Sequence, residues 1–418
     1  TKQKPEFVPG ELLVQPKPWT SKASVKAVLK RNRAQIIDEI PQIKVKLIHV
    51  PVHAQEKVQT ALSKSGRFSF VEPNYLAEPV LEPNDDNYVD QWHLPKIEAP
   101  SSWDLNFGSS DVTIAIIDTG VDPDHPDLED KLVPGKNFID DSTDTSDVHG
   151  HGTAVAGSAA AITDNDLGVA GVAWDSLIMP LMVLGSDGSA THYDIADAIS
   201  FAVSNDARVI NISLAGPSNS YTLQSAVDSA WANGAVIIAG AANESTDTPY
   251  YPAACEHVVA VGATDSSDNL AWFSNYGDWI DLCAPGTSIV TTNDGGGYGS
   301  WAGTSFSSPI TAGVAALMLS EAPGLSNADL VDLLNASADD LGAAGFDSTY
   351  GHGRVNAYQA VLAAMDAHTD VDTTAPSVWV TSPDDGETVS DSITVNADAS
   401  DNDTGVDYVE FIVDGSLI

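Results

Sequence analysis

Apolar residues recur with two different periods and divide the chain into three stretches. Within residues 1–80, apolar runs predict short strands at 11–14, 43–52 and 67–71, and helical spacing predicts helices at 24–33 and 55–65. Alternating apolar and polar positions favour half-buried strands, whereas apolar positions three or four residues apart favour helices. This order of elements predicts a small α+β unit with the split βαββαβ arrangement.

Between residues 85 and 368, near-continuous apolar strands alternate with helical segments. The strands are predicted at 112–117, 177–184, 208–214, 235–239 and 258–262, and the helices at 193–204, 222–232, 309–320 and 327–336. Strands that are apolar on both faces are typical of a parallel sheet covered by helices on both sides. In such sheets, active sites collect at the carboxyl ends of the strands.

Residues 373–418 have a third character, with strands predicted at 375–380, 392–395 and 408–413 between Asp, Gly and Pro turns. This stretch resembles the start of a bacterial Ig-like domain, although it ends about halfway through a ~100-residue sandwich. We therefore expect a partial β-sandwich that belongs to a longer protein. Residues 80–86 are polar and acidic and contain a proline, so they are expected to form an exposed linker.

Acidic residues dominate the chain, which has a formal net charge of −41. Residues 1–80 hold 13 Lys and Arg against 7 Asp and Glu, a net +6, and residues 81–418 hold 5 against 52, a net −47. So acidic a body excludes nucleic acid and anionic membranes as expected partners. It indicates instead a surface suited to salt or to divalent cations, and an attraction between the two parts. No run of 18 apolar residues exists, which excludes a membrane-spanning helix.

The sequence has two cysteines, Cys255 and Cys283. In an exported protein they could form one disulfide that contributes about 3 kcal/mol. Neither lies in a Cys-x-x-Cys motif or a Cys/His cluster, so zinc is not expected. Two buried free thiols are the alternative.

Three motifs could carry chemistry. Asp118, in Ile-Ile-Asp-Thr-Gly, ends a predicted buried strand. Asp-Thr-Gly also marks aspartic proteases, but these need a second such loop, which residues 187–189 and 414–416 do not supply. His151, in Gly-His-Gly-Thr-Ala-Val-Ala-Gly, opens a helix of small residues, and His149 is its nearby competitor.

The third motif is Gly-Thr-Ser-Phe-Ser-Ser-Pro at 303–309, which precedes an apolar helix. Ser305 is therefore expected at a helix N-terminus, where free N–H groups stabilise a developing anion. The three motifs occur in the order Asp, His, Ser, which is the order of the subtilisin triad. The chain resembles the subtilisin-like serine peptidases (subtilases) over residues 85–365 and a subtilase propeptide over residues 1–80.

The resemblance implies a domain plan and an α/β fold class. It implies a ferredoxin-like α+β propeptide at 1–80, a subtilisin-like catalytic domain at 85–368 with a parallel sheet between helices, and the truncated Ig-like domain at 373–418. It also implies a secreted serine endopeptidase, made as a self-processing zymogen that its own propeptide folds and inhibits. We expect protein and peptide substrates and a monomer.

Family roles carry over residue by residue. Ser305 would be the nucleophile, His151 the general base, and Asp118 the group that orients His151. Asn243 would bind the oxyanion together with the Ser305 N–H, although Ala242 stands where the family has glycine. Substrate would pair with two strand segments and enter a pocket tuned by Glu244, which implies basic as well as large apolar side chains at P1. The segments are Gly188, Ser189 and Ala190, and Ser213, Leu214, Ala215 and Gly216.

The resemblance also implies structural calcium, which takes oxygen ligands from carboxylates and carbonyls. The matching positions are Asp85, Asp127, Asn165 and the carbonyls of Ile162, Leu167 and Val169. Two alternatives stay open at this point: a catalytically silent scaffold displayed beside the Ig-like domain, and a hydrolase that acts on esters with the same triad. The full set of Asp118, His151, Ser305 and Asn243 argues against the silent scaffold.

Overall fold

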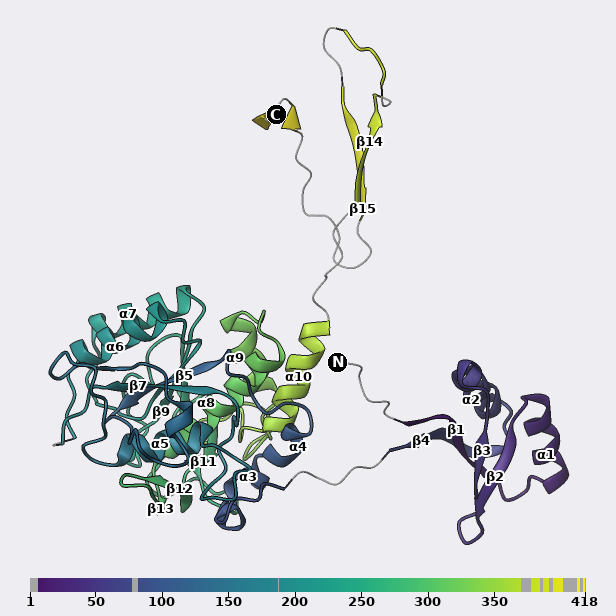
Figure 1. Ribbon diagram of the computed structural model, residues 1–418, viewed down its shortest axis with the longest axis horizontal. Helices are drawn as coiled ribbons and strands as arrows, with labels where there is room; N and C mark the ends of the chain where they lie inside the picture. The colour runs from purple at the N-terminus through teal and green to yellow at the C-terminus, as the bar shows by residue number, and fades with distance from the viewer. Residues whose placement is uncertain are drawn as a thin grey trace. The chain divides into compact units, whose positions relative to one another are not determined.

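The protein was analysed as a computed structural model that describes residues 7–76, 82–186, 188–369, 377–383, 386–390, 394–400, 412–413 and 416–417. The chain separates into two compact units, Thr1–Val80 and Leu81–Ile418. Both units are visible in Figure 1.

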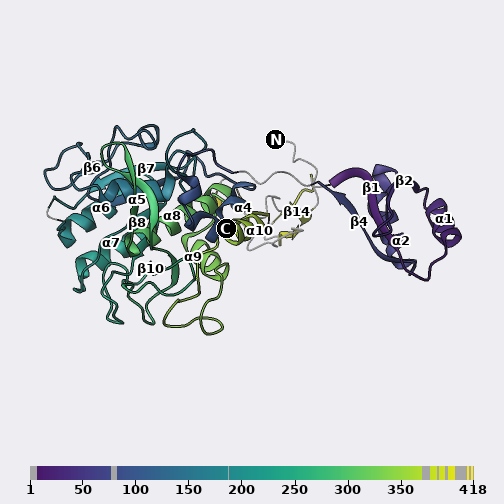
Figure 2. The same cartoon turned by 90° about the horizontal axis from the view of Figure 1, so that it is seen from below.

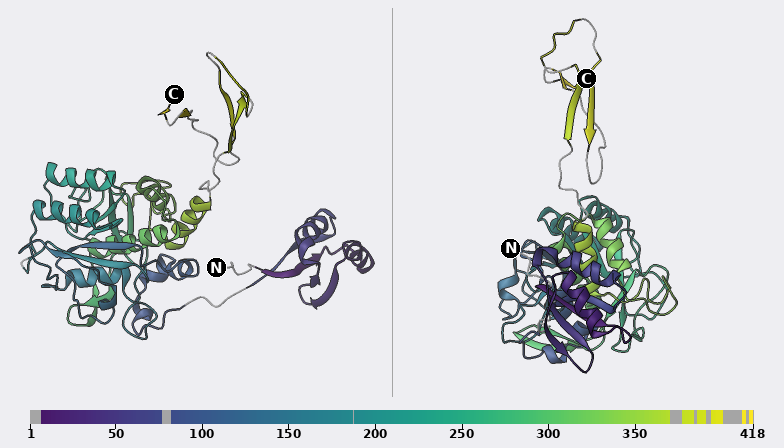
Figure 3. Two further views of the ribbon diagram at one scale, coloured as in Figure 1. Left: turned by 45° about the horizontal axis from the view of Figure 1, so that its top comes forward. Right: turned by 90° about the vertical axis from the view of Figure 1, so that its right-hand side faces the viewer.

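The N-terminal unit has the predicted βαββαβ order. Its elements are β1 (Phe7–Pro16), α1 (Lys22–Arg31), β2 (Gln35–Ile40), β3 (Val45–His49), a 3-10 turn (Val52–Ala54), α2 (Gln55–Lys64) and β4 (Phe68–Tyr75). The antiparallel sheet has the order β2-β3-β1-β4. Figure 3 shows this unit in purple. One small core, which includes Leu12, Leu29 and Ile48, joins the sheet to both helices. The sequence pattern missed β2, because all six of its residues are exposed and show no buried face.

The second unit is built on a seven-stranded parallel sheet with the order β11-β10-β9-β8-β5-β7-β6. The strands are β5 (Thr113–Asp118), β6 (Lys136–Asn137), β7 (Leu177–Met182), β8 (Val209–Ile212), β9 (Val236–Gly240), β10 (Val258–Thr264) and β11 (Leu282–Pro285). The five predicted strands are confirmed. Strands β6 and β11 have only two and four residues, too short to stand out in the apolar pattern.

Helices cover both faces of this sheet, as Figures 1 and 2 show. They are α3 (His93–Lys96), α4 (Ala99–Trp103), α5 (His151–Ala160), α6 (His192–Ser204), α7 (Tyr221–Ala232), α8 (Thr304–Glu321), α9 (Asn327–Ala336) and α10 (Ala357–Thr369). Successive residues of β5 point into different cores: Ile116 packs with α5 and α8, and Ile117 packs with α6 and α7. Two apolar layers therefore hold the strand from opposite sides.

The remaining elements include 3-10 turns at Tyr88–Asp90 and Glu129–Lys131 and the hairpin β12 (Ile289–Asn293) with β13 (Gly297–Trp301). Near the C-terminus, β14 (Ser377–Ser382) pairs with β15 (Asn396–Ser400), and β16 (Ile412–Val413) pairs with β17 (Ser416–Leu417). The strand predicted at 392–395 was therefore misplaced. The strand lies instead in Asn-Ala-Asp-Ala-Ser, whose small and polar residues gave no apolar signal. Residues 392 and 393 of the second predicted strand and residues 408–411 of the third lie outside the described residues.

The two cysteines are free thiols, so the expected disulfide is wrong. Both side chains are buried in the apolar core that lies against α6 and α7. Cys283 lies on β11, with its Sγ 3.9 Å from the carbonyl of Thr349. Cys255 lies near Asp228, and burial raises its pKa to about 11. They behave as small apolar side chains of the core.

Candidate active site

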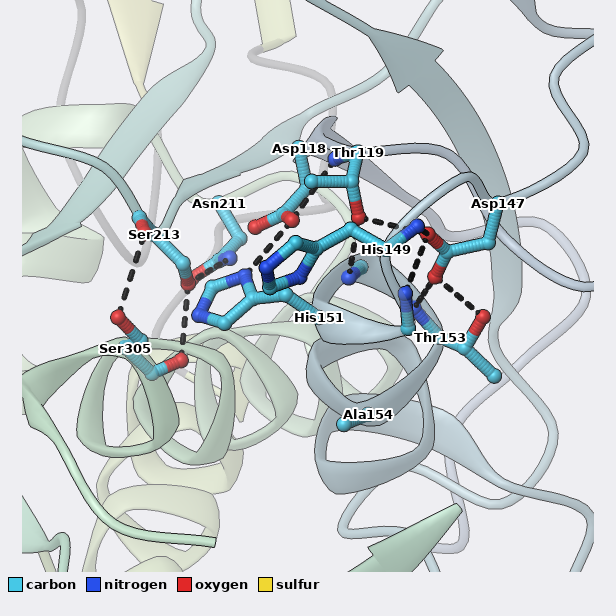
Figure 4. A network of polar contacts seen from close by, with 12 residues as sticks. Asp118, Thr119, Asp147, His149, His151, Thr153, Ala154, Asn211, Ser213 and Ser305 are labelled. Atoms are coloured by element: carbon cyan, nitrogen blue, oxygen red, sulfur yellow. Dashed lines mark hydrogen bonds and ion pairs between the residues drawn. The ribbon is translucent and has the colours of Figure 1, made fainter. Parts of the chain in front are cut away.

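Asp118, His151 and Ser305 come from separate elements that meet at one edge of the sheet. Asp118 is the last residue of β5, His151 the first residue of α5, and Ser305 the second residue of α8. Strands β5, β8 and β9 are parallel, so their carboxyl ends lie along the same edge. Figure 4 shows the His151 ring between Asp118 and Ser305. The fold thus unites residues that are far apart in the sequence.

A short hydrogen bond joins His151 to Asp118. Nδ1 of His151 lies 2.7 Å from Oδ1 of Asp118, which also accepts the N–H of Thr119 at 2.8 Å. Asp118 is fully buried. Since a carboxylate can only accept, the neutral imidazole holds its proton on Nδ1 and leaves Nε2 as an acceptor. Of the two neighbouring histidines, His151 makes this bond, and the His149 side chain is exposed.

Gly152 permits this close approach of α5 to β5. A Cβ at position 152 would lie 2.1 Å from the carbonyl oxygen of Gly120 and 3.1 Å from Cβ of Asp118. No side chain fits in that space, because both obstacles belong to the tightly packed end of β5. The glycine after His151 in the sequence motif is therefore a geometric requirement of the Asp118–His151 bond.

The surroundings of His151 favour its charged form. Burial lowers the pKa of His151, but the charge of Asp118, the hydrogen bond to it and the charge of Asp147 outweigh burial, so the pKa lies above its ordinary value of 6.5. A histidine so placed is a stronger base than an isolated one and can take a proton from a nearby hydroxyl.

Ser305 lies in the first turn of α8, where N–H groups have no helical partner. Its hydroxyl donates to the carbonyl of Ser213 at 3.3 Å, and its carbonyl accepts the Ser213 hydroxyl at 2.9 Å. Asn211 holds the Ser213 hydroxyl with a bond of 2.9 Å. The start of α8 is thereby fixed to the end of β8. The long bond of the Ser305 hydroxyl leaves it able to turn toward Nε2 of His151.

Asn243 follows β9 and is anchored by its oxygen. Its Oδ1 accepts the N–H of Thr304 at 2.9 Å and the Thr304 hydroxyl at 3.2 Å. With Oδ1 held, Nδ2 is the end left to donate, and Asn243 lines the same cavity as Ser305. Ala242 has a φ of +77°, a left-handed conformation that explains why glycine suits this position better. The alanine keeps that conformation, so the amide is not displaced from the site.

Comparison with known families and proteins decides the family of this chain. The model of the subtilase family matches residues 109–353, and the chain is 40% identical to the thermophilic serine proteinase of Bacillus sp. (strain AK1) over 360 residues, 86% of this chain and 89% of that protein. The chain belongs to the subtilase family. Thermitase of Thermoactinomyces vulgaris is 41% identical over 280 residues, which cover 67% of the subtilase chain and 99% of thermitase.

Other matches cover the flanking parts of this subtilase. The fervidolysin N-terminal prodomain matches residues 1–74, and a bacterial Ig domain matches residues 376–418. A solved protease from Pseudoalteromonas arctica PAMC 21717 superposes with a TM-score of 0.64 at 33% identity, covering 68% of this chain and 99% of that one. The subtilase is thus a serine endopeptidase with an N-terminal prodomain, and the predicted fold class is confirmed.

A cavity of about 320 Å³ opens beside the subtilase site. Besides His151, Ser305 and Asn243, its lining includes five of the eight residues predicted to bind substrate: Gly188, Ser213, Leu214, Ala215 and Glu244. Ser189 and Ala190 lie next to Gly188 but not in the lining, and the Ser189 carbonyl accepts the N–H of Gly185 at 3.4 Å.

Gly216 differs from the expectation. Its N–H donates to the carbonyl of Tyr251 at 2.9 Å, and its carbonyl accepts the N–H of Tyr251 at 2.8 Å. A backbone N–H that already has a partner cannot also pair with a substrate strand. Among the residues of this segment, Ser213, Leu214 and Ala215 therefore remain as candidates for backbone pairing.

The structure brings most of the predicted calcium ligands together. Asp127 is fully buried; its Oδ1 accepts Nδ2 of Asn165 at 2.9 Å, and its Oδ2 accepts the N–H of Val169 at 3.0 Å. Asp85 is also buried, and its Oδ1 has no hydrogen-bond partner. Burial raises the pKa of Asp85, and the nearby charge of Asp127 adds to the increase.

Two buried carboxylates that face each other need a counter-charge. Oxygen donors are what calcium prefers, so the residues present fit the ion. Among the residues that the structure describes, no three His, Cys, Asp or Glu side chains are grouped so that they could hold a metal ion. The calcium ligands would therefore have to be completed by the amide oxygen of Asn165 and the carbonyl oxygens of Ile162, Leu167 and Val169.

Sequence reasoning assigned no role to Asp147 or Thr304. Thr304 holds the side-chain oxygen of Asn243. The carboxylate of Asp147 accepts hydrogen bonds from the loop that precedes α5 and from the first turn of that helix. An aspartate four residues before His151, ahead of a predicted helix, was a usable signal, because carboxylates stabilise helix N-termini. Which groups it would bind depends on the path of the loop.

Proposed function

We propose that this subtilase cleaves peptide bonds with Ser305 as nucleophile, His151 as general base and Asp118 as the group that orients His151. The observation that carries the proposal is the 2.7 Å bond between His151 and the buried Asp118, beside a serine at the start of α8. Nε2 of His151 takes the proton as the Ser305 hydroxyl attacks the scissile carbonyl, and later gives it to the leaving amine. Water then hydrolyses the acyl-enzyme.

Two donors are available for the oxyanion: the Ser305 N–H and Nδ2 of Asn243. The Thr304 contacts that hold Oδ1 of Asn243 support this role, since a preorganised donor needs no rearrangement during the reaction. Asn243→Ala should lower kcat about 10²–10³-fold, the range known for such a donor in subtilisin.

The test of the triad is self-processing. The purified chain and its Ser305→Ala variant are incubated with calcium and followed by intact mass, with Ser320→Ala as a matched control in the same helix. The parent and the control should lose roughly 8–9 kDa from the N-terminus, about 80 residues at ~110 Da each, and Ser305→Ala should stay whole. A Ser305→Ala chain that still processes itself would refute the proposed nucleophile.

We further propose that Glu244 admits basic side chains at P1. Glu244 lines the cavity, and its backbone N–H donates to Oδ1 of Asn275 at 2.9 Å, which fixes the main chain from which its side chain extends. In a peptide library, Glu244→Gln should lose cleavage after Lys and Arg and keep cleavage after large apolar residues. An unchanged profile would contradict the assignment.

Calcium binding at Asp85 and Asp127, inhibition by the prodomain and action outside the cell complete the proposal. The buried carboxylates of Asp85 and Asp127 support calcium binding. The match of residues 1–74 to a prodomain family and the net charge of +6 on residues 1–80 support inhibition by the prodomain. Within the described residues, no helix has the length and apolar character needed to cross a bilayer. The acidic surface and the secretion typical of subtilases support an extracellular, saline setting.

A further inference from the structure

The loop before α5 is organised around one carboxylate, that of Asp147. Oδ1 of Asp147 accepts the hydroxyl of Thr119 at 2.8 Å and the N–H groups of His149 at 2.9 Å and Gly150 at 2.8 Å. Oδ2 accepts the N–H of Thr153 at 2.8 Å and its hydroxyl at 2.6 Å. Figure 4 shows these bonds converging on Asp147. Both oxygens are used, and every donor lies within four residues of His151 or directly after Asp118.

Thr119 connects this carboxylate to the catalytic aspartate. The Thr119 N–H donates to Oδ1 of Asp118, the oxygen that binds His151, and the Thr119 hydroxyl donates to Asp147. The same hydroxyl accepts the N–H of Gly152 at 2.9 Å. Residues on both sides of His151 are thus tied to the residue that follows Asp118.

Asp147 also completes the N-terminus of α5. His151 is the first residue of the helix, so the N–H groups of Gly150 and Thr153 have no carbonyl partner within it. Asp147 accepts both, and its negative charge lies at the positive end of the helix dipole. The helix start cannot turn or slide without breaking several charge-assisted bonds at once.

We propose that Asp147 is a positioning residue of the catalytic site, which fixes the start of α5 against the end of β5 so that His151 meets Asp118 in one orientation. It touches neither substrate nor the reacting atoms. The inference rests on the proposed roles of Asp118 and His151, and its test uses enzyme that has already passed the self-processing test.

The proposal also has an electrostatic side. The titratable groups beside His151 include Asp118 on β5, Asp147 and His149 on the preceding loop, and Asp294 in the β12–β13 turn beside Gly150. Trp301 and Phe306, which contact the ring, carry no charge. The charge of Asp147 helps to raise the pKa of His151. Removing that charge should lower the pKa, so neutral His151 should persist to lower pH.

The test compares three variants of the full chain. Asp147→Asn removes the negative charge and places an NH2 group against an N–H donor, so the start of α5 should shift. The kcat should fall about 10- to 100-fold, since a small displacement of His151 costs this much. Its KM should change less than about 2-fold, and the acid limb of kcat/KM should move to lower pH. Thr153→Val removes the hydroxyl that donates to Asp147 and accepts the N–H of Asp122 at 3.0 Å. It keeps the charge of Asp147, so kcat should fall less and the acid limb should stay in place.

Asp144→Asn is the matched control. Asp144 lies in the same loop, and its carboxylate contacts only Ser146, so kcat and the acid limb should not move. Unchanged kcat in Asp147→Asn would overturn the positioning role, and an unmoved acid limb would overturn the electrostatic one. If Asp147→Asn does not mature, the low-field Nδ1–H resonance of His151 is compared in Ser305→Ala precursors with and without the substitution. An identical resonance and titration would refute the proposal.

Discussion

The prodomain and the catalytic unit use charged side chains in opposite ways. Within residues 7–76, the structure describes one buried polar side chain, Gln55, and no buried charged one. Nine of the eleven described Lys and Arg side chains there are exposed. Within the described part of the catalytic unit, eight Asp, His, Lys and Arg side chains are buried: Asp85, His93, Asp118, Asp122, His125, Asp127, Lys131 and Arg354. Exposed charges contribute little to stability, whereas buried ones must be paired.

The five Lys and Arg residues after residue 80 are all engaged within the catalytic unit. They bind carboxylates or carbonyl oxygens: Lys96 and Arg354 bind Asp268, Arg354 also binds Asp339, Lys136 binds Asp141, Lys131 binds Trp174, and Arg208 binds Gly234 and Leu325. The comparison teaches that the cations of the catalytic unit hold the chain together, whereas most of those in the prodomain are exposed to solvent. Four predictions test or sharpen that contrast.

The largest effect should appear in refolding. The catalytic unit without residues 1–80 should regain activity at least about 10-fold more slowly than the full chain at low salt, because 47 net negative charges oppose its collapse. Salt near 1 M should narrow the gap, since the screening length falls from about 10 to about 3 Å. Recovery of activity after dilution from denaturant measures it. Equal rates with and without the prodomain would break the comparison.

Calcium should stabilise the catalytic unit and not the prodomain. At about 1,000 times its Kd, a bound ion adds about 4 kcal/mol. Chelation should therefore lower the unfolding midpoint of the mature enzyme by about 10 °C for a unit of this size. Asp127→Asn should abolish the response to calcium in calorimetry, whereas Asp130→Asn, at an exposed position of the same segment, should retain it. A calcium response that survives in Asp127→Asn would place the ion elsewhere.

Arg354 and Lys46 provide a direct contrast between the two units. Arg354→Met leaves Asp339 and Asp268 without their buried cation and should cost about 3 kcal/mol. Lys46→Met removes the ion pair with the exposed Glu39 and should cost about 0.5 kcal/mol. Denaturant unfolding of the Ser305→Ala precursor measures both. Similar losses would show that burial does not separate the two pairs.

The smallest effect should be a pH dependence from Lys131. Burial lowers the pKa of Lys131 to about 8, only partly offset by Asp175, while the unfolded chain keeps the ordinary value of 10.5. Between these values the unfolded chain binds a proton that the folded chain does not, so the Lys131 contribution to stability rises with pH, by about 2.5 kcal/mol between pH 7 and 10. Lys131→Met should remove that rise in unfolding experiments between pH 7 and 10. The same slope in both proteins would contradict the shift.

Much of the fold was predictable, because long apolar strands and helices carry a strong periodic signal. The five strands predicted between residues 112 and 262 match β5, β7, β8, β9 and β10. Elements without a buried face, such as β2, or with two residues, such as β6, carry no such signal. The disulfide failed for another reason: pairing depends on the distance between two sites in the fold, which the spacing of Cys255 and Cys283 does not encode.

The candidate site likewise has a part that could be predicted from the sequence and a part that could not. Asp118, His151 and Ser305 each lie in a short motif of small residues that can be recognised from the sequence alone. The role of Asp147 depends on how a loop turns back on a helix start, and the loss of Gly216 depends on a partner, Tyr251, 35 residues away. Contacts of this kind are created by tertiary structure and leave little trace in local sequence.

The engagement of every cation in the catalytic unit has a practical consequence for handling the enzyme. Once residues 1–80 are released, the remaining chain has a net charge of −47, and each of its five Lys and Arg side chains is already bound to an oxygen of the protein. The freed prodomain, at +6, is its chemical opposite. At neutral pH, maturation therefore converts one polyanion into two products that adsorb to ion exchangers of opposite sign, and the two can be collected separately from a single digest.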